Sequence, residues 1–272
     1  MGLFDVIDDI AEKQITKTEH GDNRIYGVVI GIVTDNYAEE MPGRVCVQIQ
    51  TRDSDANVLK WARVAMPSSG VGWGHYFLPE VGDQVLIVFE QGNIEKPYII
   101  GCIPKDANNF LKKAVDEKNT YKKITTKHGS SIIFTDSGEE GGESGEKDII
   151  EIHTPDMAHK FILNNDKKQI LLSDKEGENK IELNTEKGEL NIVAAKKLNI
   201  KVGDDIELTM TGSNGTTELK TKAFKIQAEN STEINANKQF KVEAPTIKIE
   251  GSSAVKVSGG PVSIEGSPIK IG

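Results

Sequence analysis

The sequence has only two cysteines and no CxxC pair, so nothing in it supports a zinc ribbon or a thioredoxin-like redox site. Cys46 and Cys102 stand in separate strand-like runs and are expected to be buried thiols, which suits synthesis in a reducing cytosol. Long apolar runs are also missing, because none approaches the roughly 18 residues that a membrane-spanning helix needs.

Positive charge and large apolar side chains are scarce as well. Lysine and arginine total 33 against 42 aspartate and glutamate, which gives a formal net charge of −9. Nucleic-acid binding and adhesion to anionic membranes both depend on clustered positive charge, so neither partner is expected. Hydrophobic residues make up 37% and aromatics 6% of 272 residues, which is low for a monomeric globule. This composition predicts either partial disorder or a thin core that several chains share.

The N-terminal segment lacks the basic start and apolar centre of a signal peptide, so export by such a signal is not expected. Residues 3–14 place apolar residues at helical spacing between acidic ones, which predicts a short amphipathic helix. Because so short a helix is marginal alone, it should pack on its own domain or on a partner. Leu3, Phe4 and Ile7 are the residues predicted to dock there.

Five β-rich runs follow within residues 24–104, separated by glycine, proline and acidic turns. Five short strands in so few residues favour a small closed barrel such as an OB-fold. Residues 1–23 precede this barrel as helix and linker. Residues 105–123 are charged, show little alternation, and are expected to form a linker with one helical turn at most.

Three residues of the barrel are assigned structural roles. Trp61 begins an alternating strand and is expected in the core, although aromatic residues of OB-folds can also stack nucleobases. Trp73 stands between two glycines and should cap a turn or contact a neighbouring subunit. Gly82 is expected to adopt a positive φ in a turn.

Residues 124–272 are predicted to be β-rich throughout. Six runs form three hairpin-like pairs: SSIIFTD with DIIEIHT, HKFILNN with KQILLSD, and NKIELNT with GELNIVA. From about residue 188, pairs of alternating apolar residues recur every seven or eight residues, with one longer interval around Gly212–Gly215. The later pairs include Phe240/Val242, Ile247/Ile249, Val255/Val257, Val262/Ile264 and Ile269/Ile271.

A strand with two inward apolar side chains cannot bury them alone, and isolated hairpins expose sheet edges. The repeats must therefore stack and meet other apolar residues across an axis. Three chains around one axis would close the core and remove the lateral edges. The predicted fold is all-β: an OB-fold barrel followed by a homotrimeric, interleaved β-helix or β-prism needle.

The barrel region resembles the OB-fold of the VgrG and phage baseplate-spike family, and the downstream repeats resemble that family's needle. The combination of motifs is more specific than any one of them. The matching pieces are Gly43-Arg44-Val45, Trp61-Ala62-Arg63-Val64, Gly72-Trp73-Gly74, Pro79-Glu80-Val81-Gly82-Asp83-Gln84-Val85 and Lys96-Pro97.

The resemblance implies a structural central spike that attaches to a baseplate hub and punctures a target envelope, touching the membrane only then. It implies synthesis in the bacterial cytoplasm and assembly into a phage tail, bacteriocin or secretion particle. Only about 23 residues precede the barrel, where full-length relatives carry a hub domain, so the hub or tail-tube protein should be separate. Leu3, Phe4 and Ile7 are then the hub-docking residues.

The end of the sequence, SGGPVSIEGSPIKIG, keeps the apolar alternation, and a prism that stopped there would expose core atoms. Some relatives close their apex with an HxH iron site. The five histidines of this sequence, the last being His159, all lie far from residue 272. The resemblance therefore implies a separate PAAR-like tip protein bound by Val262, Ile264, Ile269 and Ile271.

No pattern predicts catalysis or a cofactor. GxSxG, HExxH and P-loop motifs are absent from the sequence. His153, Asp156 and His159 surround a proline and are better explained as solvated turn residues than as metal ligands. The alternatives left open are an OB-fold binder of nucleic acid or oligosaccharide, a peptidoglycan-degrading spike, and a receptor-binding fibre.

Overall fold

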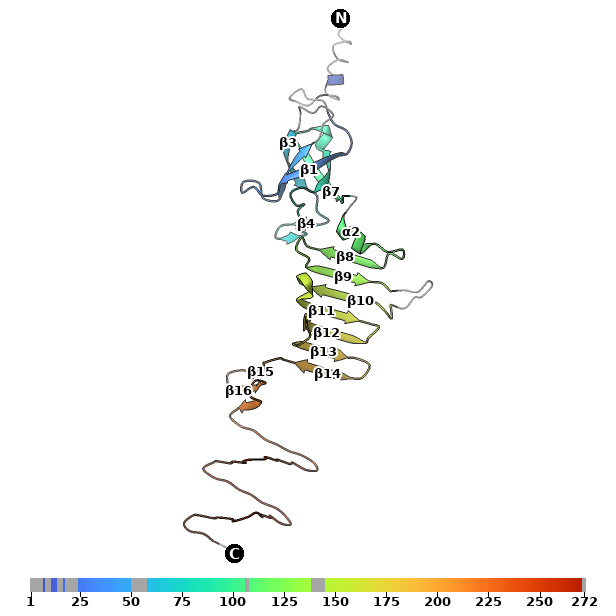
Figure 1. Cartoon of the computed structure of the whole chain (residues 1–272). Helices are drawn as coiled ribbons and strands as arrows, with labels where there is room; N and C mark the ends of the chain where they lie inside the picture. Colours follow the sequence, from blue (N-terminus) through green and yellow to red (C-terminus); the bar gives the residue numbers. More distant parts are fainter. Residues whose placement is uncertain are drawn as a thin grey trace. The chain divides into compact units, whose positions relative to one another are not determined.

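The computed structural model describes residues 7, 11–13, 17, 24–49, 58–105, 108–137 and 145–270. The chain divides into two compact units, residues 1–196 and residues 197–272 (Figure 1). Among the described residues, no helix combines the length and apolar character that crossing a membrane would require.

The first unit begins with a closed five-stranded barrel, as the sequence predicts for residues 24–104. The strands follow the order β1-β2-β3-β7-β6 around the barrel, and the β3–β7 pair is parallel while the other four barrel pairs are antiparallel. Their bounds are Val29–Asp35 (β1), Arg44–Ile49 (β2), Val58–Val64 (β3), Gln84–Phe89 (β6) and Pro97–Ile103 (β7).

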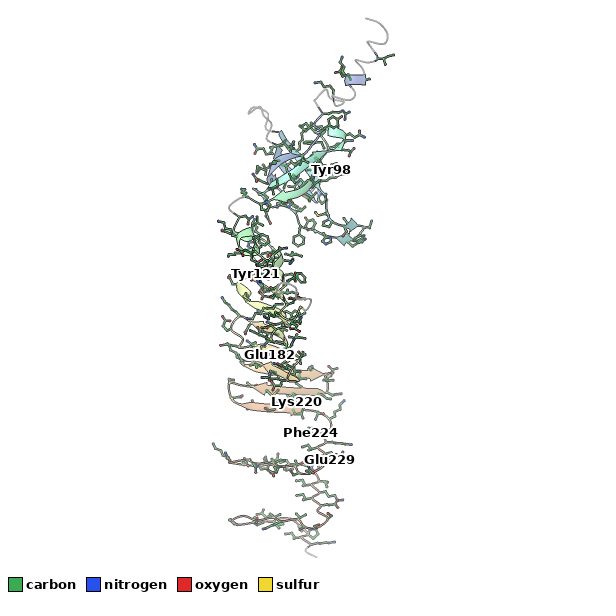
Figure 2. The ribbon with its side chains drawn as sticks, turned by 90° about the vertical axis from the view of Figure 1, so that its right-hand side faces the viewer. Tyr98, Tyr121, Glu182, Lys220, Phe224 and Glu229 are labelled. Atoms are coloured by element: carbon green, nitrogen blue, oxygen red, sulfur yellow. The ribbon has the colours of Figure 1, made fainter. Side chains whose placement is uncertain are left out.

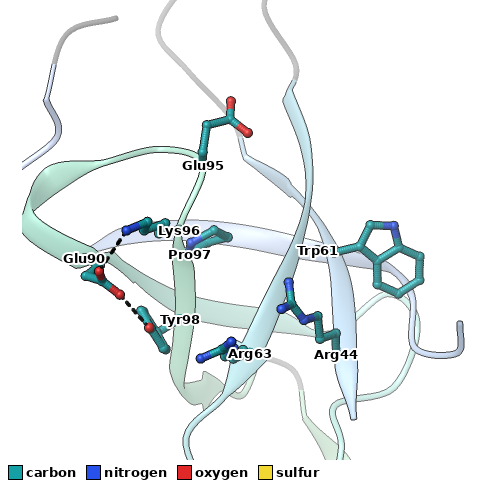
Figure 3. Close-up of a pocket in the computed structure, with 8 residues that line it drawn as sticks. All are labelled: Arg44, Trp61, Arg63, Glu90, Glu95, Lys96, Pro97 and Tyr98. Atoms are coloured by element: carbon teal, nitrogen blue, oxygen red, sulfur yellow. Dashed lines mark hydrogen bonds and ion pairs between the residues drawn. The ribbon is translucent and has the colours of Figure 1, made fainter. Parts of the chain in front are cut away.

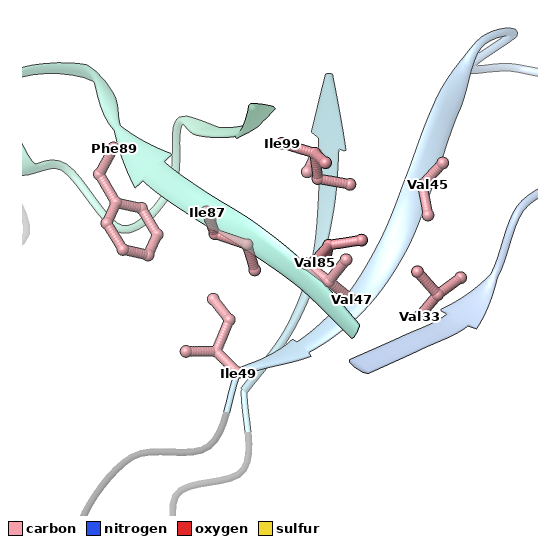
Figure 4. Close-up of a cluster of buried hydrophobic side chains, with 9 residues drawn as sticks. Val33, Val45, Val47, Ile49, Val85, Ile87, Phe89 and Ile99 are labelled. Carbon is pink, nitrogen blue, oxygen red and sulfur yellow. The ribbon is translucent and has the colours of Figure 1, made fainter. Parts of the chain in front are cut away.

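The barrel core forms because alternate residues of each strand point inward (Figure 4). In β6, Val85, Ile87 and Phe89 are buried while the residues between them are only half-buried. Complete burial of one such side chain contributes about 1.5–3 kcal/mol. The cluster consists of Val33, Val45, Val47, Ile49, Ala62, Val85, Ile87, Phe89 and Ile99.

Trp61 is not part of this core, contrary to the sequence-based prediction. It is half-buried and lies directly opposite Cys46, on the face that alternates with the inward Ala62. The interior of a five-stranded barrel leaves room there for a methyl group, so the indole lies outside. The prediction of two buried thiols is half wrong: Cys46 is buried, whereas Cys102 on β7 is exposed.

Gly82 adopts the positive φ that its turn predicts, at 92°. Its amide donates to the carbonyl of Val33 over 2.8 Å, and the Asp83 amide donates to Glu80 over 3.0 Å. These bonds close the turn that leads into β6. A residue with a Cβ would be strained at this φ even though the surrounding space is open.

A short hairpin and three short helical segments accompany the barrel and its sheet. The hairpin pairs β4 (Ser69–Gly70) with β5 (Trp73–Gly74). The helix α2 (Asn109–Ala114) lies in the predicted linker, and Asn108 caps it by accepting from the amides of Phe110 and Leu111. The 3-10 turns are η1 (Glu90–Gly92) and η2 (Pro155–Met157).

A seven-stranded antiparallel sheet completes the first unit, and neighbours in sequence are neighbours in space (Figure 1). All three predicted hairpins are confirmed as β9–β10, β11–β12 and β13–β14. The bounds are Tyr121–Thr125 (β8), Ser131–Thr135 (β9), Ile149–His153 (β10), His159–Asn164 (β11), Gln169–Asp174 (β12), Lys180–Asn184 (β13) and Glu189–Val193 (β14).

Two turns of this sheet repeat the same asparagine chemistry. The side chain of Asn164 accepts from the amide of Lys167, and that of Asn184 accepts from the amide of Lys187, each over 2.9 Å. Each turn ends with a positive φ, 49° at Lys168 and 68° at Gly188. These turns reverse the chain sharply enough for each strand to pair with the one before it.

The second unit begins with a three-stranded antiparallel sheet: β15 (Lys197–Val202), β16 (Ile206–Thr211) and β17 (Thr216–Lys220). Residues 221–270, called the tail below, carry the predicted repeats but contain no paired strand and no helix. The tail runs as extended segments joined by bends (Figure 1). A strand needs a neighbour for its ladder, and the single chain supplies none here.

Candidate assembly interface

One face of the seven-stranded sheet carries two continuous apolar ladders. They follow from the register, because each strand from β9 to β14 places its two alternating apolar residues directly opposite those of the next strand. The first ladder is Ile124, Ile132, Ile152, Phe161, Leu172, Ile181 and Ile192. The second is Phe134, Ile150, Leu163, Ile170, Leu183 and Leu190, with Lys122 at its start.

This ladder face is open to solvent in the single chain. Leu172 at its centre is 50% exposed, and Leu190 near its end is 62% exposed. Monomeric proteins rarely leave a contiguous apolar surface of this extent uncovered. The face is therefore the strongest candidate for an interface.

The opposite face of the same sheet is more polar along its central column. Glu182 accepts from Lys180 over 2.7 Å and from Gln169 over 2.6 Å. These two contacts, with that of Lys180 the larger, lower the pKa of Glu182. The opposite face is mixed, because Ile133, Ile162 and Leu171 stand in the same column as Glu182. The two continuous apolar ladders therefore distinguish the first face.

The tail exposes the same kind of apolar pairs without any sheet behind them. All of its large apolar side chains in the described part are at least half exposed. The segment that carries Phe224 and Glu229 runs without a paired strand beside it (Figure 2). Within the described tail, no backbone–backbone hydrogen bond forms. The apolar side chains and the backbone of the described tail thus lack the partners that a paired strand provides.

A second candidate surface is a cavity of about 320 Å³ on the outside of the barrel (Figure 3). Arg44 and Arg63 face it from directly opposite positions of β2 and β3. Like charges at opposite positions repel, so the pair costs stability. Figure 3 shows an ion pair between Glu90 and Lys96 and a hydrogen bond from Tyr98 to Glu90, and it draws no dashed line to either arginine.

The chemistry of this cavity is set by those contacts. Tyr98 donates to Glu90 over 2.8 Å and Lys96 donates to it over 3.1 Å, and in that order they lower the pKa of Glu90. Trp61 contributes an aromatic wall. Two guanidinium groups beside an indole suit a planar anion, a carboxylate or a phosphate.

The predicted site residues are only partly described. Leu3, Phe4 and Ile271 lie outside the described residues. Ile7 is helical and exposed, and the remaining tip-binding residues Val262, Ile264 and Ile269 are exposed in the tail.

The histidines show no metal-binding arrangement in the part of the chain that is described. Nδ1 of His153 lies 2.8 Å from the carbonyl of Thr154, and its Nε2 lies 3.5 Å from a carboxylate oxygen of Glu151. His159 pairs through its amide with the hydroxyl of Thr154. These contacts belong to the turn that η2 occupies.

The barrel is the part of the structure that indicates a protein family. Residues 29–103 match the type VI secretion system/phage-baseplate injector OB domain. The resemblance predicted from the barrel motifs is confirmed over this range. The match starts at the first residue of β1 and ends at the last residue of β7, so the injector OB domain coincides with the closed barrel.

Two curated proteins of Pseudomonas aeruginosa are similar over part of the chain. The type VI secretion system spike protein VgrG4b is 34% identical over 92 residues, which cover 31% of this chain and 11% of that protein. The type VI secretion system spike protein VgrG5 is 32% identical over 97 residues, covering 33% and 12% respectively. The matched part of the chain thus spans about a tenth of the length of these relatives.

Sequence reasoning missed two features near the injector OB domain. The opposed arginines were quoted as family motifs, but their facing positions depend on strand register. The β4–β5 hairpin was read as a turn around Trp73, although it exposes Val71, Trp73, Tyr76 and Phe77. An apolar cluster in a glycine-rich loop was the signal available for it.

Proposed function

We propose that three copies of this chain form the central spike of a contractile injection system. The observation that carries the proposal is the ladder face: a sheet that follows an injector OB domain and leaves two apolar ladders uncovered. Burying these ladders against two other copies removes their apolar surface from water.

Three copies suit the narrow width of the sheet. Its strands have five or six residues, and each presents two apolar side chains to the ladder face. Three such faces around one axis enclose both ladders, and each lateral edge meets the next copy. The tail then finds its missing backbone partners in the other two chains, as an interleaved β-helix.

The proposed work of the spike is mechanical. A stiff prism transmits the force of sheath contraction to a small area and punctures the target envelope. This role requires no catalytic residue and no cofactor, and the spike is proposed not to be an enzyme. It is assembled in the producing bacterium as part of the baseplate of an injection particle.

Two partners are proposed at the ends of the chain. A separate hub or tail-tube protein takes the N-terminal helix through Leu3, Phe4 and Ile7. A PAAR-like tip protein covers the apolar end formed by Val262, Ile264, Ile269 and Ile271. The exposure of Ile7 and of the described tail residues supports both contacts.

The decisive experiment is a mass measurement of the full chain by sedimentation equilibrium. The proposal expects three times the chain mass of 29.7 kDa, independent of concentration in the micromolar range. A stable folded monomer contradicts it. Purified particles should also contain the hub and a tip protein, and particles without a tip protein contradict that partner.

The arginine cavity favours one alternative, an OB-fold that binds an anionic oligosaccharide or a nucleic acid. Arg63→Glu would then abolish binding of single-stranded DNA or heparin measured at physiological salt, while Lys118→Glu on an exposed turn would not. The net charge of −9 opposes this alternative, because a polyanion is repelled by the rest of the chain.

A further inference from the structure

Most charged side chains of the barrel have a bonding partner in the single chain. In the described ranges 24–49 and 58–103, the carboxylates that accept a hydrogen bond are Asp35, Glu80, Asp83, Glu90 and Glu95. The cations that donate one are Arg24, Lys60 and Lys96. Within the same ranges, Glu39 and Glu40 make no hydrogen bond or ion pair, and neither do Arg44 and Arg63. The barrel thus leaves two carboxylates and two guanidinium groups without a partner.

The two guanidinium groups belong to the cavity on the outside of the barrel, called the arginine cavity below. Arg44 stands directly opposite Arg63, and Trp61 lines the same cavity. The carboxylates that also line it, Glu90 and Glu95, are already bound by other side chains. The charge of Arg63 lowers the pKa of Glu90, but less than the two hydrogen bonds of that carboxylate do. An added carboxylate between the arginines would accept from both and remove their repulsion.

The two unpaired carboxylates lie on the loop between β1 and β2, residues 36–43, called the acidic loop below. Glu39 and Glu40 are exposed there. The loop leads directly into β2, and the amide of Arg44 donates to the carbonyl of Met41 over 3.2 Å. The acidic loop and the arginine cavity therefore lie at the same end of the barrel, although the loop does not line the cavity of its own chain.

We propose that the acidic loop of one copy binds the arginine cavity of the next copy, with its two carboxylates paired to the two arginines. This inference rests on the proposed trimer and describes how its barrels meet. Guanidinium groups bind carboxylates through two parallel hydrogen bonds, which fixes the geometry of the contact as well as its charge. The contact therefore determines how neighbouring barrels are oriented around the axis.

Charge complementarity identifies a second copy as the occupant. The unpaired carboxylates and the unpaired guanidinium groups of the barrel are equal in number and opposite in sign, and they do not reach each other within one chain. Because both patches lie at one end of the barrel, a closed ring brings the loop of each copy to the cavity of its neighbour near the axis. Tyr37 of the acidic loop is 74% exposed and would then lie beside Trp61 of the neighbouring copy.

The trimer also favours this occupant over a free anion. An exposed ion pair between unlinked molecules contributes little, because its charges are screened and its side chains must be ordered. Copies that are already held together by their ladder faces present the acidic loop at a high effective concentration. The net charge of −9 further repels a free polyanion from the chain.

The first test exchanges the charges. The loop variant is Glu39→Arg with Glu40→Arg, the cavity variant is Arg44→Glu with Arg63→Glu, and the exchange variant carries all four substitutions. Calorimetry at low salt should show a melting temperature several degrees lower for the loop and cavity variants, because like charges then meet. The exchange variant restores opposite charges and should recover most of the loss, so that the effects are not additive.

Two controls make this cycle specific. Glu176→Arg with Glu178→Arg, on an exposed turn of the sheet, changes the net charge as the loop variant does and should not rescue the cavity variant. In a Leu172→Asp background, where a charge on the ladder face keeps the copies apart, the recovery in the exchange variant should disappear. Recovery in that monomer would place the contact within one chain and overturn the proposal.

The second test joins the two patches covalently. Arg63→Lys keeps the positive charge and supplies an amine, which a carbodiimide couples directly to a carboxylate in contact with it. A denaturing gel should show species of two and three times 29.7 kDa, and mass spectrometry should find peptides linked between residue 63 and residue 39 or 40. The same variant with Glu39→Gln and Glu40→Gln, or in the Leu172→Asp background, should lack these linked peptides.

The failures can be told apart. If sedimentation shows a trimer but the exchange variant recovers no more than the control, the barrel contact is overturned and the spike proposal stands. If the trimer binds heparin and the cavity variant does not, the cavity serves a free polyanion and the contact is overturned as well. If the full chain sediments as a folded monomer, both proposals fail together.

Discussion

The sheet β8–β14 and the tail share one sequence pattern, but among the described residues only the sheet forms paired strands within the chain. Both alternate apolar and polar residues, and both expose the apolar set in the single chain. In the sheet, four- and five-residue turns with a positive φ, as at Gly177 and Gly188, fold each strand back on its predecessor. In the tail the glycines, Gly251 among them, have no positive φ, and the described chain does not pair with itself.

The difference lies in the spacing and in the turns. Apolar pairs in the sheet recur about every ten residues, as from Phe161 to Ile170 to Ile181, which leaves room for a full turn after each strand. From Phe240 onward the step in the tail is seven or eight residues, as from Ile247 to Val255. Spacing alone does not prevent a reversal, because β15 and β16 pair at an eight-residue step. In the proposed trimer, other copies cover a face of the sheet, whereas in the tail they also supply partners for the backbone.

The largest effect should come from a charge on the ladder face. Leu172→Asp places a carboxylate at its centre, and burying an unpaired charge three times around the axis costs several kcal/mol per copy. Sedimentation should show a monomer. Lys175→Asp, on an exposed turn of the same sheet, is the control and should remain trimeric. Trimers from both variants would remove the ladder face from the interface.

Hydrogen exchange at backbone amides measures the protection of the sheet and of the tail separately. In the assembled wild type, amides of residues 224–269 should be protected as well as those of β11–β13. In the Leu172→Asp chain the tail should exchange at the rate of an unfolded peptide, while the interior strands of the sheet keep their protection. Protection of the tail in that monomer would mean that it pairs within its own chain.

A smaller effect is expected at the turn before β6. Gly82→Val forces a β-branched residue to φ 92° and should lower the stability of the barrel by about 1–3 kcal/mol. Gly101→Ala on β7 is the control, because its φ is ordinary and no atom lies within 4 Å of the added carbon. Differential scanning calorimetry checks both, and equal melting temperatures would contradict the strain.

The smallest effect concerns pH. The folded pKa of Glu182 lies below its ordinary value of 4.5 because Lys180 and then Gln169 donate to its carboxylate. Its contribution is therefore present above pH 4.5 and is lost as the pH falls through the folded pKa. Glu182→Gln should flatten the decline of melting temperature on acidification, and Glu176→Gln on an exposed turn should leave the decline unchanged. An identical decline in all three proteins would contradict the linkage.

The sequence predicted the barrel and the hairpins because their signals are local. Alternation marks which residues share a face, and glycine turns mark where strands reverse. Alternation does not say which of two faces is the inner one. Trp61 was placed inside because it begins an alternating strand, but the interior takes Ala62, so the indole and Arg63 lie outside. The opposed position of Arg44 depends on register, which a strand alone does not determine.

The tail shows a second limit of prediction from sequence. Its repeats predict strands, and the pairing that would make them strands is not contained in one chain. The sequence left Trp73 as a turn cap or a contact with a neighbouring subunit, and the β4–β5 hairpin with its exposed Val71 and Trp73 became visible only in the structure. The candidate interfaces became visible only when exposure was known for each face.

Because the strands of the sheet pair within one chain, the sheet can form before the tail does. In the proposed trimer, the hairpins of the sheet close within a newly made polypeptide, whereas the tail waits for other copies. The first encounter between chains is then a collision whose rate depends on their concentration. Once three sheets have met, the tails are tethered side by side, and their winding proceeds at a rate that dilution no longer changes. A chain that does not meet other copies keeps its tail unpaired, and proteases can cleave the tail.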